Sequence, residues 1–210
     1  MYTVTEKTQH SFRAKGSKFI GYLFPVVSKE DFESKLNGIK SKYPDATHHC
    51  YAWRINPTNT KEFSQDDGEP SGTAGKPILN KLKSYDMINC GCVVVRYYGG
   101  TKLGTAGLIQ AYAQSAECCL EKAERSTIIP TQNVAITYPY HQQKAIDQLK
   151  NRFDLKELEA QYLEKVTIKM ACRLDHWDSF SDTLEELEHT GVTTEYLEKG
   201  CVTMSNSQGR

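Results

Sequence analysis

The chain has 210 residues, of which 39% are hydrophobic and 25% charged, and its 26 basic side chains balance 26 acidic ones. This composition is ordinary for a globular protein and excludes collagen-like, disordered and disulfide-scaffold classes, and no segment reaches the roughly 20 apolar residues that span a bilayer. The seven cysteines form no Cys-x-x-Cys pair. Because residues 1–7 also lack an apolar run, we expect a reduced, cytoplasmic protein without a signal peptide.

The charge is distributed unevenly along the chain. Residues 1–130 carry 17 basic and 13 acidic side chains, a net of +4, whereas residues 131–210 carry 9 and 13, a net of −4. This difference in sign predicts two domains with different surfaces. A net of +4 is compatible with a phosphate-binding surface but does not require one.

The first predicted elements are a strand over 19–27, which is rich in β-branched and aromatic residues, and a helix that follows it. Ser28 and Asp31 have the spacing of a capping box, and Pro44 ends the helix. Its apolar residues repeat at helical spacing: Phe32, Leu36, Ile39 and Tyr43.

The pattern then predicts a strand over 49–55, a loop over 63–77 and a short helix with Pro77 in its first turn. Residues 90–98 form a near-continuous apolar run, typical of a buried central strand. A long helix follows Gly99 and Gly100. Its apolar stripe comprises Leu108, Ile109, Tyr112, Ala113, Ala116, Cys119, Leu120 and Ala123.

The second half predicts the order β-α-β-β-α-β of a ferredoxin-like domain. The expected elements are strands over 133–138 and 192–204, helices over 141–153 and 175–190, and two strands within 157–174. Pro130 is expected to break the chain between the halves. The predicted fold is therefore α+β, with domains over 1–130 and 131–205 and a polar tail over 206–210.

The stretch 63–77, here the acidic loop, is rich in small and acidic residues. Its backbone N–H groups at the start of the next helix, beside Lys76, predict a seat for an anion. It is not a Walker A loop, because six residues separate Gly68 from Gly75 and Pro77 replaces the hydroxyl residue. The alternative is an ordinary surface loop that leads into a helix.

A second glycine-rich stretch, residues 96–107 or the tyrosine loop, also leads into a helix and carries Lys102. The tetrapeptide Gly-Thr-Ala-Gly occurs in both loops, at 72–75 and 104–107. Two helix starts with one lysine each are suited to phosphate groups, and Tyr97 and Tyr98 are suited to stacking on bases. Alternatively, the glycines only turn the chain and the tyrosines pack in the core.

Other residue clusters allow chemistry but do not demand it. The carboxylates of Asp66, Asp67 and Glu69 could bind a hard cation through their oxygens or act in acid–base catalysis. The alternative is that they form a solvated turn. Cysteine nucleophiles at Cys50 or Cys92, with His48 or His49 as base, lack an activating motif. Neither His48-His49-Cys50 nor Cys90-x-Cys92 has zinc spacing, so the cysteines are expected to pack as small apolar side chains.

The predicted helix over 175–190 carries six carboxylates and an inner apolar stripe of Trp177, Phe180, Leu184 and Leu187. The charges indicate a solvated face or a docking surface for a basic protein partner. RNA is not expected to contact this helix, because like charges repel phosphates. The carboxylates are those of Asp175, Asp178, Asp182, Glu185, Glu186 and Glu188.

Several of these segments together resemble the signature of the IMPACT family. The matching segments are Lys18-Phe19-Ile20, Asp66 to Gly75, Gly75 to Leu79, Leu82, Met87 and Val93 to Gly104. The resemblance covers about residues 5–125, and the remainder is similar to the ferredoxin-like C-terminal domain of bacterial members.

This resemblance implies a first domain similar to the second domain of a small-subunit ribosomal protein, with left-handed βαβ topology. It also implies a cytoplasmic protein linked to translation, and no established catalytic residues come with the family. We expect no metal and no cofactor. The motif positions form a candidate surface for RNA or the ribosome: Asp66, Asp67, Gly68, Glu69, Ser71, Gly72, Thr73, Gly75, Lys76, Arg96, Tyr97, Gly99, Gly100, Lys102 and Gly104.

Three hypotheses follow. The first is a non-enzymatic protein that binds RNA or the ribosome through the two loops. The second is a metal- or phosphate-dependent hydrolase or nucleotide-acting enzyme that uses Asp66, Asp67, Glu69 and Lys76. The third is a protein-interaction adaptor that uses the acidic helix. None of them involves a membrane.

Overall fold

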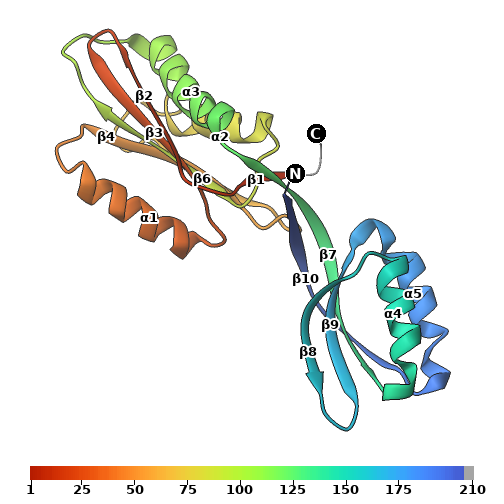
Figure 1. Ribbon diagram of the computed structural model, residues 1–210. Coiled ribbons are helices and arrows are strands. Elements are labelled where there is room, and N and C mark those ends of the chain that lie inside the picture. The colour runs from red at the N-terminus through yellow and green to blue at the C-terminus, as the bar shows by residue number, and fades with distance from the viewer. Residues whose placement is uncertain (206–210) are drawn as a thin grey trace. The chain divides into compact units, whose positions relative to one another are not determined.

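The computed structural model describes residues 1–205, so the predicted tail over 206–210 lies outside it. The fold is α+β and has two compact units, Met1–Thr127 and Ile128–Met204, each with a sheet and its own core (Figure 1). No helix in the described part of the chain is long and apolar enough to cross a membrane.

The first unit is built on a five-stranded antiparallel sheet in the order β2-β3-β6-β4-β5. Its strands are β2 (Thr8–Ala14), β3 (Ser17–Pro25), β4 (His48–Ile55), β5 (Lys61–Gln65) and β6 (Cys90–Tyr97). A short strand, β1 (Tyr2–Val4), pairs instead with the start of β7 (Arg125–Tyr138). The central strand β6 is buried from Cys90 to Arg96, as its apolar run predicts.

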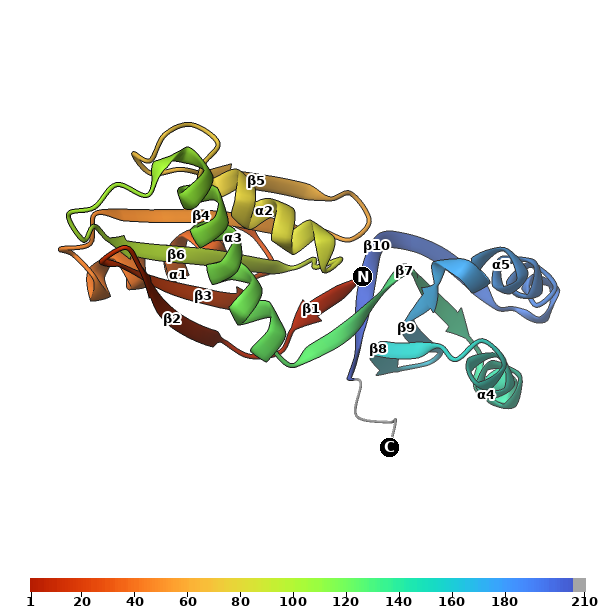
Figure 2. The same ribbon diagram turned by 90° about the horizontal axis from the view of Figure 1, so that it is seen from above.

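Helices cover both faces of this sheet, as Figure 2 shows. Helix α1 (Lys29–Lys42) packs on one face through Phe32, Leu36 and Ile39. Helices α2 (Gly75–Ser84) and α3 (Gly104–Lys122) pack on the other face. The predicted cap of α1 is confirmed, because the Ser28 hydroxyl accepts a hydrogen bond from the Asp31 N–H at 3.1 Å.

The connections of this sheet have an unusual handedness. The β3-α1-β4 and β5-α2-β6 units each join two parallel strands across one intervening strand. The two units run in opposite directions along the strand order, since one goes from β3 to β4 and the other from β5 to β6. Their helices cover opposite faces of the sheet, and the strands of one unit are antiparallel to those of the other. One of them must therefore be left-handed, although such connections are right-handed in nearly all proteins. This agrees with the left-handed βαβ topology that the family resemblance implies.

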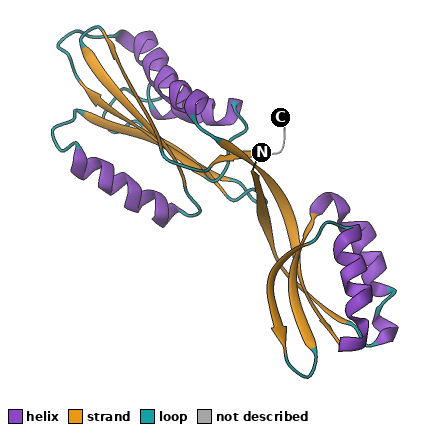
Figure 3. Cartoon of the chain, viewed as in Figure 1, coloured by secondary structure: helices purple, strands orange, loops and turns teal. Residues whose placement is uncertain are grey.

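The second unit has the β-α-β-β-α-β order predicted for a ferredoxin-like domain. Its elements are β7, α4 (Gln143–Arg152), β8 (Lys156–Tyr162), β9 (Val166–Arg173), α5 (Trp177–Glu185) and β10 (Thr193–Ser205). Short 3-10 turns flank the helices: η1 (Tyr140–Gln142), η2 (Leu174–His176) and η3 (Glu188–Thr190). Helices α4 and α5 lie on one face of the sheet (Figure 3). Their buried residues Ile146, Leu149, Phe180 and Leu184 belong to the core of this unit.

The structure corrects several predicted boundaries. Strands β1 and β2 were not expected, and Phe63 to Gln65 belong to β5 rather than to a loop. Pro130 does not break the chain but lies inside β7, between the residues that pair with β1 and those that pair with β9.

Two predicted helices also differ from the structure. On α3, Ile109 is 41% exposed and lies outside the buried stripe. Helix α5 ends at Glu185 rather than at Thr190.

The close contact between α1 and the sheet predicts the effect of a single methyl group. A Cβ on Gly91 would lie 2.5 Å from Cδ2 of the buried Phe32 ring, so we expect Gly91→Ala to lower the free energy of unfolding by about 1–3 kcal/mol. Urea denaturation measures the change. Gly38→Ala is the control, because a Cβ at this mid-helix position meets nothing within 4 Å. It should stabilise α1 by about 0.5–1 kcal/mol, and equal effects of the two substitutions would contradict the packing described.

Candidate functional site

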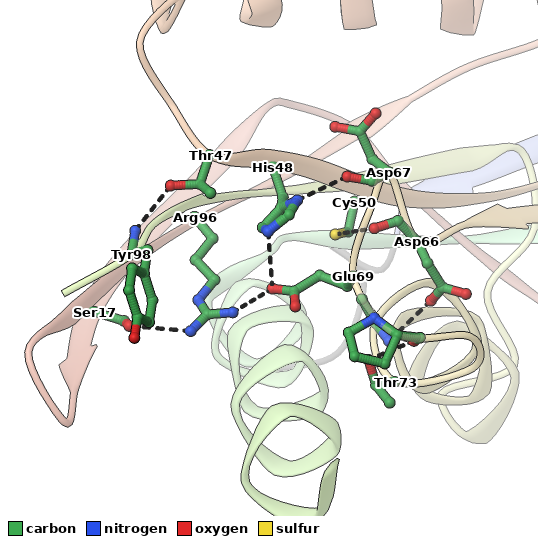
Figure 4. A network of polar contacts seen from close by, with 12 residues as sticks. Ser17, Thr47, His48, Cys50, Asp66, Asp67, Glu69, Thr73, Arg96 and Tyr98 are labelled. Carbon is green, nitrogen blue, oxygen red and sulfur yellow. Dashed lines mark hydrogen bonds and ion pairs between the residues drawn. The ribbon is translucent and has the colours of Figure 1, made fainter. Parts of the chain in front are cut away.

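The acidic loop and the tyrosine loop lie side by side at one end of the first unit's sheet (Figure 4). The irregular part of the acidic loop is 66–74, between β5 and α2, and that of the tyrosine loop is 98–103, between β6 and α3. Arg96, the last buried residue of β6, donates a hydrogen bond to Glu69 Oε1 at 2.5 Å. This contact joins the two loops across 27 residues of sequence.

Asp66 holds the acidic loop closed. Its carboxylate accepts hydrogen bonds from the N–H groups of Gly72, Ala74 and Gly75, at 2.8, 3.0 and 2.8 Å. The bonds from Ala74 and Gly75 satisfy two backbone donors at the start of α2, whose N-cap Ala74 has no side-chain cap. The anion seat predicted at this helix start is therefore filled by the chain's own carboxylate.

Asp67 and Gly68 turn the chain back toward β4. Both have positive φ values, 46° and 88°, as in a type I′ turn. The Asp67 carboxylate accepts a hydrogen bond from His49 N–H at 2.6 Å, and its carbonyl oxygen lies 2.8 Å from His48 Nδ1. Because a carbonyl only accepts, Nδ1 carries the proton in this contact.

Glu69 is the centre of a buried polar network. Its side chain is 4% exposed, and Oε1 accepts hydrogen bonds from Arg96 and from the Tyr112 hydroxyl at 2.8 Å. His48 Nε2 lies 3.8 Å from the same oxygen. Burial raises the pKa of Tyr112, which keeps the phenol protonated as the donor.

The tyrosine loop is anchored by two hydroxyls from distant strands and loops. Ser17 Oγ accepts hydrogen bonds from Arg96 Nη2 and from Gly99 N–H, both at 3.2 Å. Thr47 Oγ1 accepts one from Tyr98 N–H at 3.0 Å. A Cβ on Gly99 would lie 2.0 Å from the carbonyl carbon of Gly16, so only glycine fits at this crossing of two chain segments.

A pocket of about 330 Å³ opens where the two loops meet. Glu69 and Pro70 line it from the acidic loop, and the remaining lining comes from β6, the tyrosine loop and α3. Those further lining residues are Arg96, Tyr98, Lys102, Leu103, Gly104, Thr105 and Leu108. Of the residues predicted for the candidate surface, Glu69, Arg96, Lys102 and Gly104 line this pocket.

This pocket, here the Arg96 pocket, offers hydrogen-bond donors and an aromatic ring. Helix α3 has no side-chain cap at Leu103, and Lys102 is exposed and forms no ion pair with any described residue. Nε of Arg96 is buried without a hydrogen-bond partner. Tyr98 is 46% exposed, and the guanidinium carbon of Arg96 lies 5.5 Å from the centre of its ring.

Other predicted site residues lie outside this pocket. Lys76 and Gly72 line a separate depression of about 470 Å³ beside α2, so the two lysines do not converge. Tyr97 packs partly against the core under α1. Thr73 and Gly75 are buried, whereas Ser71, Gly99 and Gly100 are exposed.

Several residues of the site were not predicted from the sequence. Ser17, Thr47 and Tyr112 anchor the network, and Pro70 and Thr105 line the Arg96 pocket. Only the glycine-rich context of Thr105 carried a local signal.

The described residues contain no group of three or more His, Cys, Asp or Glu side chains arranged to hold a metal ion. The cysteines of the first unit's core are poorly suited to nucleophilic chemistry. Burial raises the pKa of Cys50 and Cys92, and raises those of Cys90 and Cys119 to about 12.

On and around α5, the six predicted carboxylates are all exposed, and Phe180 and Leu184 are buried beneath them. This is a solvated face, and its use as a docking surface for a basic protein stays a prediction.

Comparison with known proteins identifies a family whose model covers both loops. The family model described as the Impact N-terminal domain matches residues 15–120. A Haemophilus influenzae protein described as an IMPACT family member is 32% identical over 89% of this chain and 91% of its own length. The Escherichia coli IMPACT family member YigZ is 35% identical over 75% of this chain and 78% of its own.

Among solved structures, one described as a hypothetical protein has a TM-score of 0.65 and 30% identity, covering 94% of this chain and 97% of its own. It supports the two-unit α+β fold.

The buried pair of Arg96 and Glu69 generates a stability prediction. We expect Glu69→Ala to cost about 3–5 kcal/mol of unfolding free energy, because it leaves the Arg96 guanidinium buried and unpaired. Arg96→Met should cost a similar amount, and the double variant should cost clearly less than the sum of the two. Urea denaturation of the four proteins measures the cycle. Additive costs would show that the pair is not coupled.

The buried thiols generate a reactivity prediction. At pH 8, iodoacetamide should modify the native protein only at Cys118 and Cys201, which are partly exposed. The remaining five should react only after denaturation, because burial keeps them in the thiol form. Mass spectrometry of tryptic peptides measures the modification. Rapid labelling of Cys50 or Cys92 in the native protein would instead support the cysteine-nucleophile hypothesis.

Proposed function

The chain belongs to the IMPACT family, and from that premise we propose that it is a non-enzymatic cytoplasmic protein that acts in translation by binding RNA, in particular on the ribosome. The observation that carries the binding part is the Arg96 pocket, which combines free backbone donors, an unpaired lysine and an exposed tyrosine. The translational part comes from the family resemblance.

The start of α3 supplies the contacts for a phosphate group. A helix N-terminus carries a partial positive charge, and its first N–H groups point along the axis toward an anion. Lys102 adds a full charge at the rim of the same pocket. The start of α2 differs, because Asp66 already occupies its donors. Phosphate binding is therefore assigned to α3 and not to α2.

Tyr98 supplies the contact for a base. Its ring is 46% exposed, and a stacked base would extend the contact that Arg96 already makes with it. Stacking of this kind does not depend on the identity of the base, because every base has a π face. We therefore propose binding to single-stranded or looped RNA with little sequence preference.

The acidic residues of the acidic loop serve this site as scaffold. Asp66 and Asp67 accept hydrogen bonds from backbone N–H groups, and Glu69 pairs with Arg96. Each carboxylate is thus engaged by the chain itself, and repulsion of an incoming phosphate is reduced. For the same reason we assign these residues no catalytic role.

The proposal predicts separate effects of charge and ring on RNA binding. Lys102→Ala should weaken binding to a single-stranded oligonucleotide and lower the slope of log K against log salt by about 0.7, the value of one phosphate contact. Tyr98→Ala should cost about 1–3 kcal/mol, whereas Tyr98→Phe should bind as the native protein does, because the ring is kept. Fluorescence anisotropy over a salt series measures both effects, and co-sedimentation tests binding to ribosomes.

Lys76→Ala is the matched control, since Lys76 is equally a lysine near a helix start but lies outside the Arg96 pocket. It should bind nearly as tightly as the native protein. The proposal fails if the native protein binds neither RNA nor ribosomes at low salt, or if Lys76→Ala and Lys102→Ala weaken binding equally.

A further inference from the structure

A second pocket of about 480 Å³ lies on the α1 side of the first unit's sheet. Its lining includes Lys35, Gly38 and Lys42 from α1, Phe24 from the end of β3, and Lys7 from the segment between β1 and β2. Arg96 and the two loops do not contribute to it. The volume is within the range of small-molecule sites. We name it the α1 pocket.

Gly38 is the least expected residue in its wall. It lies in the middle of a helix of 14 residues, where glycine is unfavourable because of its backbone entropy. A Cβ at this position would meet nothing within 4 Å, so no packing contact explains the absence of a side chain. What the glycine does provide is open space beside the pocket.

Two of the lysines are available to a ligand. Lys7 Nζ lies 4.7 Å from the centre of the Tyr22 ring, and Lys42 Nζ lies 3.4 Å from the Tyr22 hydroxyl. Neither forms an ion pair with any described residue. Lys35 differs, because it donates to the Asp31 carboxylate and to a carbonyl oxygen.

The rest of the pocket is largely apolar. Phe24 and Ile39, which are 3% and 5% exposed, line it together with Pro25. Glu6 is the single carboxylate of its lining. Two cations without an ion pair, beside an apolar wall, match a ligand with one anionic group and a flat ring. The nearby carboxylate disfavours a polyanion such as an RNA strand.

We propose that the α1 pocket is a second binding site, for a small anion of the mononucleotide class: a phosphate monoester that carries a flat ring. The phosphate lies between Lys7 and Lys42, and the ring lies along Phe24 and Ile39, in the space beside Gly38. The site is separate from the Arg96 pocket, because α1 covers the opposite face of the sheet from α3.

The test uses the full chain and adenosine monophosphate as the probe, with isothermal titration calorimetry as the readout. Gly38→Leu should weaken binding at least tenfold by filling the space, and its melting temperature should equal or exceed that of the native protein, because leucine is the better helix former. Gly38→Ala should bind more tightly than Gly38→Leu. The Lys7→Met/Lys42→Met double variant should also bind at least tenfold more weakly.

Lys29→Met is the control for charge, since Lys29 is on the same helix, outside the pocket and paired with Glu33. It should bind like the native protein. Adenosine, which lacks the phosphate, and inorganic phosphate, which lacks the ring, should each bind more weakly than the monophosphate.

Two results would overturn the proposal. One is the absence of saturable binding of the monophosphate up to about 1 mM. The other is unchanged binding in Gly38→Leu and in the double lysine variant. If Gly38→Leu instead weakens binding of an RNA oligonucleotide and not of the monophosphate, the pocket is part of an RNA path and the small-anion assignment is wrong.

Discussion

The buried ion pair of Arg96 and Glu69 is the constraint on which the rest of the site depends. Removing two charges from water is costly, and the attraction between them offsets this cost only when their remaining hydrogen-bonding groups are also satisfied. Here Tyr112 donates to Glu69 and Ser17 accepts from Arg96, which leaves Nε of Arg96 as the one buried donor of the pair without a partner. These partners come from α3 and β3, so the pair couples both loops to the rigid sheet and to the helix behind it. The irregular parts of both loops, 66–74 and 98–103, are therefore held in place by contacts with the sheet and with α3.

The two loops differ in which groups their hydrogen bonds engage. In the acidic loop, the carboxylates of Asp66 and Asp67 accept hydrogen bonds from backbone donors, among them the N–H groups of Ala74 and Gly75 at the start of α2. In the tyrosine loop, Ser17 and Thr47 hold the backbone, while the start of α3 and Lys102 stay unpaired. Two loops that contain the same tetrapeptide thus differ in whether a side chain accepts from the start of the following helix. The difference arises from one carboxylate, Asp66, that has no counterpart before α3.

Sequence patterns predicted the elements whose causes are local. The cap of α1 depends on residues three apart, and β6 is recognised by an unbroken apolar run. The candidate surface was located by its glycines, but its assembly depends on contacts between residues 27 to 79 positions apart, such as Ser17 with Arg96, which no local pattern shows. Strand β2 was not predicted. Its residues are alternately half-buried and exposed, and none is fully buried, so the sequence has no strong apolar alternation there. The chain break predicted at Pro130 was wrong, because whether a strand accommodates a proline depends on how that strand pairs. Strand pairing is again a contact between residues distant in sequence.

The opposite hands of the two crossovers have a consequence for binding. One crossover places α1 by itself on one face of the sheet, and the other places α2 on the far face, where α3 joins it. A helix packed without a helical neighbour exposes both of its flanks, and the α1 pocket lies along one of them. The Arg96 pocket instead depends on the end of a helix. The two pockets on this sheet thus differ in their lining: the start of α3 and the Tyr98 ring contribute to one, and lysines and apolar side chains to the other. The sheet lies between the two pockets, and they share no lining residue.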